Sequence, residues 1–150
     1  MTRALGVVAE KNKILYTCLS NSGSGAAIVV VEEDELATPA THHDRGAQLS
    51  WLLAESRGLL SRLMPNAVVL QKPGTGFSRD RVEVEGLIQV AAHDAGIKLK
   101  MLVREGVRAR LGVPQETGAF QRMLAEADVA ARPNAATRER YVFAKAALTL

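Results

Sequence analysis

The first 32 residues contain three strand-like segments with no room for a helix between them. Residues 3–9, 14–19 and 26–32 are rich in β-branched and other apolar side chains. The intervening residues 10–13 and 21–25 are polar or rich in glycine and serine, which is typical of turns. Connections this short join antiparallel neighbours, because a parallel pair needs a crossover connection of about a dozen residues or more. The beginning of the chain therefore predicts a three-stranded antiparallel meander.

The remainder of the chain alternates between helical and strand-like segments. A helix is predicted from about Asp44, whose carboxylate suits a helix N-terminus, to Met64, because Pro65 ends it. Further helices are predicted over residues 78–95, 104–111, 116–127 and from Pro133 to Leu150, and further strands over residues 67–70 and 97–103. Right-handed crossovers place these two strands beside the first, which gives the strand order 3-2-1-4-5. The sequence thus predicts an α/β fold of the ribonuclease H-like type, with a five-stranded mixed sheet and helices on both faces.

Size and composition indicate one globular domain over residues 1–150. A chain of 150 residues with 47% hydrophobic and 23% charged residues can bury a substantial core, and no linker or repeat divides it. The longest apolar run, residues 26–31, is too short to cross a membrane, and the single Cys18 excludes an internal disulfide. The start of the chain does not have the pattern of a secretory signal. We therefore expect a cytoplasmic protein that is not associated with a membrane.

Two local groups of cations stand out in a chain whose 19 Lys and Arg residues exceed its 16 acidic residues by three. The first group begins within the fifth predicted strand and continues after it, and the second group surrounds the loop after the fourth strand. Such groups suit contacts with the phosphates of DNA or RNA, although a solvated basic face has the same composition. The predicted nucleic-acid contacts are therefore Lys98, Lys100, Arg104, Arg108 and Arg110 in the first group, and Lys72, Arg79 and Arg81 in the second.

Several segments resemble the RuvC-like Holliday junction resolvases, a branch of the ribonuclease H-like superfamily. Residues 67–73, Ala-Val-Val-Leu-Gln-Lys-Pro, are similar to the family's strand that ends in a catalytic glutamate. Residues 84–92 are similar to the helix that follows that strand, and residues 97–112 to the next strand and its basic turn. Residues 5–8, Leu-Gly-Val-Val, resemble the family's opening L-G-I-D strand. The resemblance implies a nucleic-acid-binding protein and, because such proteins are often homodimers, a homodimer.

The resemblance also implies positions for the metal-binding acids of a nuclease. RuvC-like nucleases hold two divalent cations with carboxylates at the ends of the first and fourth strands and on the final helix. The corresponding positions here are Val8, Gln71 and residues 138–141, of which only Glu139 is acidic and is flanked by two arginines. Valine has no ligand atom, glutamine is neutral, and the arginines bring positive charge. This pattern favours a protein that has lost the nuclease site and needs no cofactor.

Three hypotheses for function follow. The first is a catalytically degenerate domain that binds nucleic acid or a protein partner. The second is an active, Mg²⁺-dependent nuclease whose acids have moved, with Glu10, Glu55 and Glu139 as candidates. Glu10 lies two residues beyond Val8, and ribonuclease H enzymes also carry an acid on the first helix, where Glu55 lies. The third is a protein-interaction scaffold without a nucleic-acid role. Convergence of three carboxylates at metal-bridging distance would favour the second hypothesis.

Overall fold

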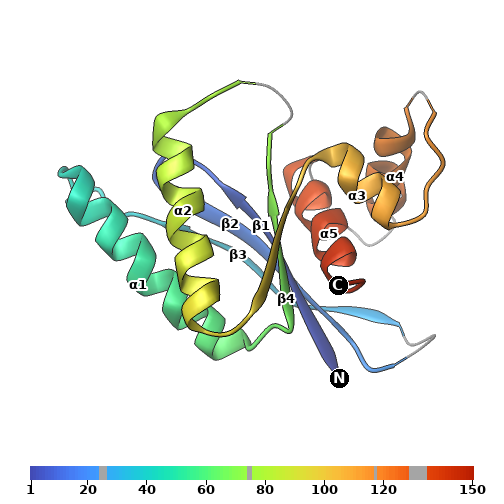
Figure 1. The fold of residues 1–150 in the computed structure, drawn as a ribbon, viewed down its shortest axis with the longest axis horizontal. Coiled ribbons are helices and arrows are strands. Elements are labelled where there is room, and N and C mark those ends of the chain that lie inside the picture. Colours follow the sequence, from blue (N-terminus) through green and yellow to red (C-terminus); the bar gives the residue numbers. More distant parts are fainter. Residues whose placement is uncertain (24–26, 74–75, 117, 129–134) are drawn as a thin grey trace.

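The computed structural model describes residues 1–23, 27–73, 76–116, 118–128 and 135–150, which build a five-stranded mixed sheet (Figure 1). The strands are β1 (Thr2–Ala9), β2 (Lys13–Asn21), β3 (Ile28–Ala37), β4 (Ala67–Gln71) and β5 (Lys98–Leu102). Their order is β3-β2-β1-β4-β5, in which β3, β2 and β1 are antiparallel neighbours and β1, β4 and β5 are parallel. The predicted meander and the predicted strand order are confirmed.

Strand β3 extends further than the sequence pattern predicts. The expected strand ended at Glu32, but pairing with β2 continues to Ala37, opposite Lys13. The extension adds three acids, Glu33, Asp34 and Glu35, directly after Glu32. Because β3 is an edge strand, acids are tolerated there, and their charge discourages pairing with another chain. The predicted start of this strand, Ala26, lies outside the described residues.

The helices begin and end close to the predicted positions. They are α1 (Arg45–Leu63), α2 (Arg79–Asp94), α3 (Arg104–Arg110), α4 (Ala119–Asp128) and α5 (Ala135–Ala147). The Asp44 side chain caps α1 by accepting a hydrogen bond from the Ala47 amide, and the Ser78 side chain caps α2 in the same way. The predicted opening of the last helix at Pro133 lies outside the described residues. Among the helices that the structure describes, none is both long and apolar enough to cross a membrane.

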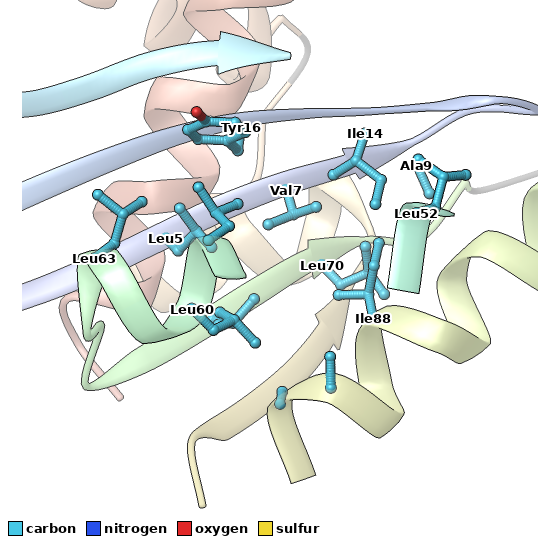
Figure 2. Packing of buried hydrophobic residues seen from close by; sticks show 14 of the residues in the cluster. Leu5, Val7, Ala9, Ile14, Tyr16, Leu52, Leu60, Leu63, Leu70 and Ile88 are labelled. Atoms are coloured by element: carbon cyan, nitrogen blue, oxygen red, sulfur yellow. The ribbon is translucent and has the colours of Figure 1, made fainter. Parts of the chain in front are cut away.

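The helices cover both faces of the sheet, as predicted (Figure 1). Helices α1 and α2 pack on one face, where Leu5 and Leu70 of the sheet meet Leu60 and Ile88 of the helices (Figure 2). Helices α3, α4 and α5 pack on the other face, in a cluster that contains the fully buried Phe143. Alternate residues of β1 therefore face opposite helix layers. This assigns Ala4, Gly6 and Val8 to the α5 side.

Gly6 lets α5 lie directly against β1. A Cβ atom at this position would lie 2.4 Å from the carbonyl oxygen of Arg140 and 2.5 Å from the amide nitrogen of Ala144, so only glycine fits without a shift of the helix. The close approach carries Glu139 and Arg140 to the sheet near the ends of β1 and β4. Gly6 thus positions the segment of α5 around Glu139, where the resemblance implies a metal-binding acid.

Candidate functional site

A cavity of about 360 Å³ lies where β1 and β4 end. Its lining comes from the end of β1, the turn that follows, the end of β4 and the start of α2, and it consists of Val8, Ala9, Glu10, Lys11, Gln71, Pro73, Ser78 and Arg81. The carboxyl ends of neighbouring parallel strands and a helix N-terminus meet here, which is a common place for a ligand site in α/β folds. Two of the three positions implied by the resemblance, Val8 and Gln71, line this cavity.

Glu139 of α5 contacts both Gln71 and Arg104 and so joins three elements of the fold. Its Oε1 atom accepts a hydrogen bond from Nε2 of Gln71 at 2.6 Å and another from Nε of Arg104 at 2.7 Å. A second guanidinium nitrogen of Arg104 lies 3.2 Å from Oε2. The hydrogen bond to Glu139 raises the pKa of Arg104, and the same guanidinium lies 5.4 Å from the ring centre of Phe120. The resemblance implies metal ligands at the positions of Gln71 and Glu139. In this protein the Glu139 carboxylate instead accepts hydrogen bonds from the Gln71 amide and the Arg104 guanidinium.

Arg140 places a second guanidinium on the same face of the sheet. It is 7% exposed, and its Nε atom is buried without a hydrogen-bond partner in the described residues. Burial lowers the pKa of Arg140, while the negative charges of Glu33, Glu35 and Glu10 act in the opposite direction. Arg140 thus places a buried guanidinium on α5 directly after Glu139.

The three candidate acids for a displaced nuclease site do not form one cluster among the described residues. Glu10 is exposed beside the cavity, and its Oε2 atom lies 3.4 Å from Nζ of Lys13. Glu55 is exposed on α1, which packs on the face opposite α5. Glu139 is the acid bound by Arg104. Among the described residues, no three His, Cys, Asp or Glu side chains are grouped closely enough to hold a metal ion.

The cations of the first predicted group are largely engaged within the protein. Four of the five donate hydrogen bonds to protein acceptors, which fixes their direction and satisfies part of their bonding capacity. The fifth, Lys100, has an exposed side chain on the edge strand β5. The acceptors are the Leu150 carbonyl for Lys98, Glu139 for Arg104, Glu105 and the Val113 carbonyl for Arg108, and the Thr149 hydroxyl for Arg110.

The cations of the second predicted group lie near the start of α2, and two of the three are exposed. The Arg79 side chain is 88% exposed, and Lys72 is exposed directly after β4. Arg81 turns toward the buried Glu85, with 3.2 Å between its Nε atom and Oε1 of the acid. Phe77, between these cations, is 82% exposed. An exposed aromatic ring beside exposed cations is a combination that binds unpaired bases and phosphates in nucleic-acid-binding proteins.

Sequence reasoning missed two cations at this end of the molecule. Lys11 lies in the turn between β1 and β2 and lines the cavity, and its side chain is 71% exposed. Arg45 lies in the first turn of α1 and donates hydrogen bonds to the backbone carbonyls of Lys11 and Asp80. The polar break at residues 10–13 signalled a turn, but only the packing of α1 and α2 brings that turn beside Arg79.

Comparison with known proteins finds the same fold in Holliday junction resolvases. RuvC of Thermus thermophilus has a TM-score of 0.75 at 14% identity, covering 99% of this chain and 92% of that one. T. thermophilus RuvC in complex with its Holliday junction substrate has a TM-score of 0.68 at 17% identity, with the same coverage. Fowlpox virus resolvase in complex with substrate Holliday junction DNA has a TM-score of 0.58 at 10% identity, covering 98% of this chain and 97% of that one. No protein-family model matches the sequence, and no curated protein matches it.

These likenesses agree with the strand order of the sheet. They extend over nearly the whole of this chain and over most of each resolvase. The chain has the ribonuclease H-like fold of the RuvC-type Holliday junction resolvases.

Proposed function

We propose that this protein binds nucleic acid through the ends of β1 and β4 and the start of α2, without cleaving it. The observation that carries the proposal is the bonding of Glu139, which accepts hydrogen bonds from Gln71 and Arg104. A two-metal nuclease needs carboxylate ligands around divalent cations. A guanidinium already neutralises Glu139, and a neutral amide occupies the position at the end of β4. The retained fold therefore offers a binding surface in place of a cleavage centre.

The exposed groups around this surface support contact with phosphates and bases. Lys72 and Arg79 supply positive charge, Arg81 lines the cavity, and Phe77 supplies an exposed ring. The two resolvases described above with Holliday junction DNA make branched DNA the first ligand to test. Affinity carried by phosphate contacts falls as salt rises, because binding releases condensed counterions.

Fluorescence anisotropy with labelled four-way and duplex DNA, at about 50 and 200 mM salt, tests the proposal. We expect binding at the lower salt concentration that weakens at the higher one, and Arg79→Ala should weaken it. Arg57→Ala is the matched control, because Arg57 pairs with Asp94 at the other end of α2 and its loss also removes one positive charge. Absence of binding at low salt would overturn the proposal and favour a protein-interaction scaffold.

One observation favours the second candidate function, a divergent metal-dependent nuclease. Glu10 lines the same cavity as Gln71, so one carboxylate and one amide oxygen face a shared space. Incubation of branched DNA with Mg²⁺ or Mn²⁺ decides between the two functions. We expect intact DNA. Cleavage that disappears in Glu10→Gln and Glu139→Gln would establish the nuclease and contradict the binding-only proposal.

We further propose that the protein acts as a homodimer, with the outer face of α2 as the contact. Val82 and Val90 are 42% and 49% exposed, and they lie four residues before and after Gly86. Two antiparallel copies of α2 that cross at Gly86 would place Val82 of each copy against Val90 of the other. This mutual contact is what a two-fold symmetric interface requires. Light scattering should give twice the chain mass for the wild type and one chain mass for Val82→Glu/Val90→Glu. A monomeric wild type would contradict this.

We also propose that the protein acts in the cytoplasm, where nucleic acid is present.

A further inference from the structure

A second cavity, of about 430 Å³, lies between the starts of α1 and α2 and the turn that joins β1 to β2. It is lined by Lys11, His43, Arg45, Gln48, Arg79, Asp80 and Glu83. Lys11 also lines the first cavity, so the two cavities adjoin one another along this side chain. The second cavity contains none of the positions that the resemblance implies for a nuclease centre. Its chemistry must therefore be deduced from its own residues.

Arg45 holds the two sides of this cavity together. Its Nη1 atom donates to the carbonyl oxygen of Lys11 at 2.7 Å, and its Nη2 atom donates to the carbonyl oxygen of Asp80 at 2.8 Å. Nη1 also lies 3.2 Å from Oε1 of Gln48, on the next turn of α1. A guanidinium is a planar, rigid fork, so these bonds fix the β1–β2 turn relative to the start of α2. The backbone of Lys11 is thereby placed beside Arg79.

The ion pairs around this cavity are long, with no nitrogen–oxygen distance below 3.7 Å. The Lys11–Asp80 pair and the Arg45–Glu83 pair are each separated by 3.7 Å. The Arg45–Asp80 and Arg79–Glu83 pairs are each separated by 3.9 Å. By contrast, Arg104 lies 2.7 Å from its acid, and such charge-assisted hydrogen bonds are much stronger than loose exposed pairs. Among the described residues that line the cavity, three cationic side chains face only two carboxylates.

Two of the cations that line the cavity, Lys11 and Arg79, can turn toward an external anion at little cost. Lys11 and Arg79 are 71% and 88% exposed at their side chains, so water already screens their attraction to Asp80 and Glu83. The first amide groups of α2 lie at the same place and add the positive end of the helix dipole. One negative charge would balance the surplus cation, and a phosphodiester carries one negative charge per phosphate.

We propose that Lys11 and Arg79 form a seat for a backbone phosphate of nucleic acid, and that Arg45 is the positioning residue of this seat. The inference rests on the proposed function, because it assigns a further part of the same nucleic-acid surface. It extends that surface from the loop after β4 to the β1–β2 turn and the beginning of α1. Arg45 does not touch the phosphate. It holds the backbones of Lys11 and Asp80 in place through hydrogen bonds to their carbonyl groups.

The seat is tested by anisotropy titrations of the full chain with four-way and duplex DNA, in parallel for each variant. Lys11→Ala and Arg79→Ala remove exposed side chains, so both variants should fold. Each should weaken binding about tenfold, with a similar loss for both DNA forms, and should reduce the salt slope by about one. Arg57→Ala, which removes one positive charge at the far end of α2, should change the affinity less than twofold.

Two further variants test whether Arg45 acts by positioning the seat or by contacting the phosphate with its own charge. Arg45→Lys keeps the charge but cannot span the two carbonyl oxygens, so it should weaken binding as much as Arg45→Ala does. In the Lys11→Ala background, Arg45→Ala should have a much smaller effect than in the wild type, because residues that act through one another are not additive. Full binding by Arg45→Lys would show that charge alone matters and would overturn the positioning role.

The outcomes separate this inference from the function on which it rests. If the wild type does not bind DNA at low salt, the proposed function fails and the seat fails with it. If the wild type binds and Arg79→Ala weakens binding, but Lys11→Ala stays within twofold of wild type, only the seat is wrong. Competition by inorganic phosphate at constant ionic strength distinguishes a general anion site from one that needs the nucleic-acid chain. Displacement of DNA by millimolar phosphate would contradict the assignment to a backbone phosphate.

Discussion

Nε2 of Gln71 lies 2.6 Å from Oε1 of Glu139, so the end of β4 and the beginning of α5 are joined by a hydrogen bond between a neutral amide and a carboxylate. Arg104 donates to the same oxygen. This arrangement stabilises the negative charge of Glu139 without a metal ion. It also orients both side chains, since the acid accepts from two directions.

Two substitutions at the ends of β1 and β4 should create a divalent-cation site. Val8→Asp/Gln71→Glu adds two carboxylates beside Glu139, and hard oxygen ligands of this kind suit Mg²⁺. The double variant should melt at a lower temperature than the wild type without metal, because like charges repel. Mg²⁺ at a hundredfold excess over its dissociation constant should then stabilise the variant by about 2.7 kcal/mol. Thermal melts with and without Mg²⁺, with Val8→Asn as the uncharged control, measure the effect. An equal response in the control would contradict the site.

Gly6→Ala should destabilise the fold through the contact between β1 and α5. The added Cβ would meet backbone atoms of Arg140 and Ala144, which cannot move without displacing the helix. Overpacking of this kind costs about 1–3 kcal/mol. Urea denaturation measures the change in the free energy of unfolding. The matched control is Gly58→Ala in α1, where a Cβ meets no described atom within 4 Å and where alanine should stabilise the helix by about 0.5–1 kcal/mol.

Glu32 should make the stability of the protein depend on pH in the acid range. Hydrogen bonds from Arg62 and from Tyr16 lower the pKa of Glu32 to about 2. A carboxylate with a lowered pKa in the folded state contributes stability above its unfolded pKa, and this contribution is lost as the pH falls toward 2. The wild type should therefore lose stability between about pH 4.5 and pH 2, and Arg62→Ala should lose less over the same interval. Chemical denaturation at a series of pH values checks this. Parallel curves for the two proteins would show that the ion pair has no such role.

Cys18 should react slowly with thiol reagents while the protein is folded. It is completely buried in β2, and burial raises the pKa of its thiol to about 11. The thiolate is the reactive form, so both accessibility and ionisation oppose reaction at neutral pH. A colorimetric thiol assay should show a slow reaction in buffer and a fast one in concentrated guanidinium chloride. A fast reaction in buffer would mean that β2 opens readily or that the pKa of the thiol is not raised.

Much of the fold could be predicted because the decisive information is local. Short polar breaks fix the first three strands as antiparallel neighbours, and Pro65 ends the first helix. The extension of β3 could not be predicted in this way. Its acids resemble a loop in composition, whereas at the edge of a sheet they pair with β2 through their backbone, and Glu33 also accepts a hydrogen bond from the Thr17 hydroxyl.

The candidate site was less accessible to sequence reasoning, because charge in a sequence does not reveal its partners. Arg104 and Arg108 look like free cations until α5 and the neighbouring turn supply Glu139 and the Val113 carbonyl. Lys11 shows the opposite case, since an ordinary turn residue becomes part of a cationic surface once α2 packs beside it. The spacing of residues along the sequence does not reveal which distant residues come into contact in the folded protein.

The acids of β3 have a consequence for how a polyanion approaches the molecule. They lie at one open edge of the sheet, while Lys98 and Lys100 lie at the other edge, on β5. Negative side chains therefore gather along one edge of the sheet and positive ones along the other, while Arg62 and Lys13 pair with Glu32 and Glu35. A charged rod such as DNA feels this asymmetry before contact, because long-range fields act at distances up to the screening length, about 8–10 Å in physiological salt. Rotation in that field turns the β3 edge away from the rod, so that productive encounters begin on the opposite side.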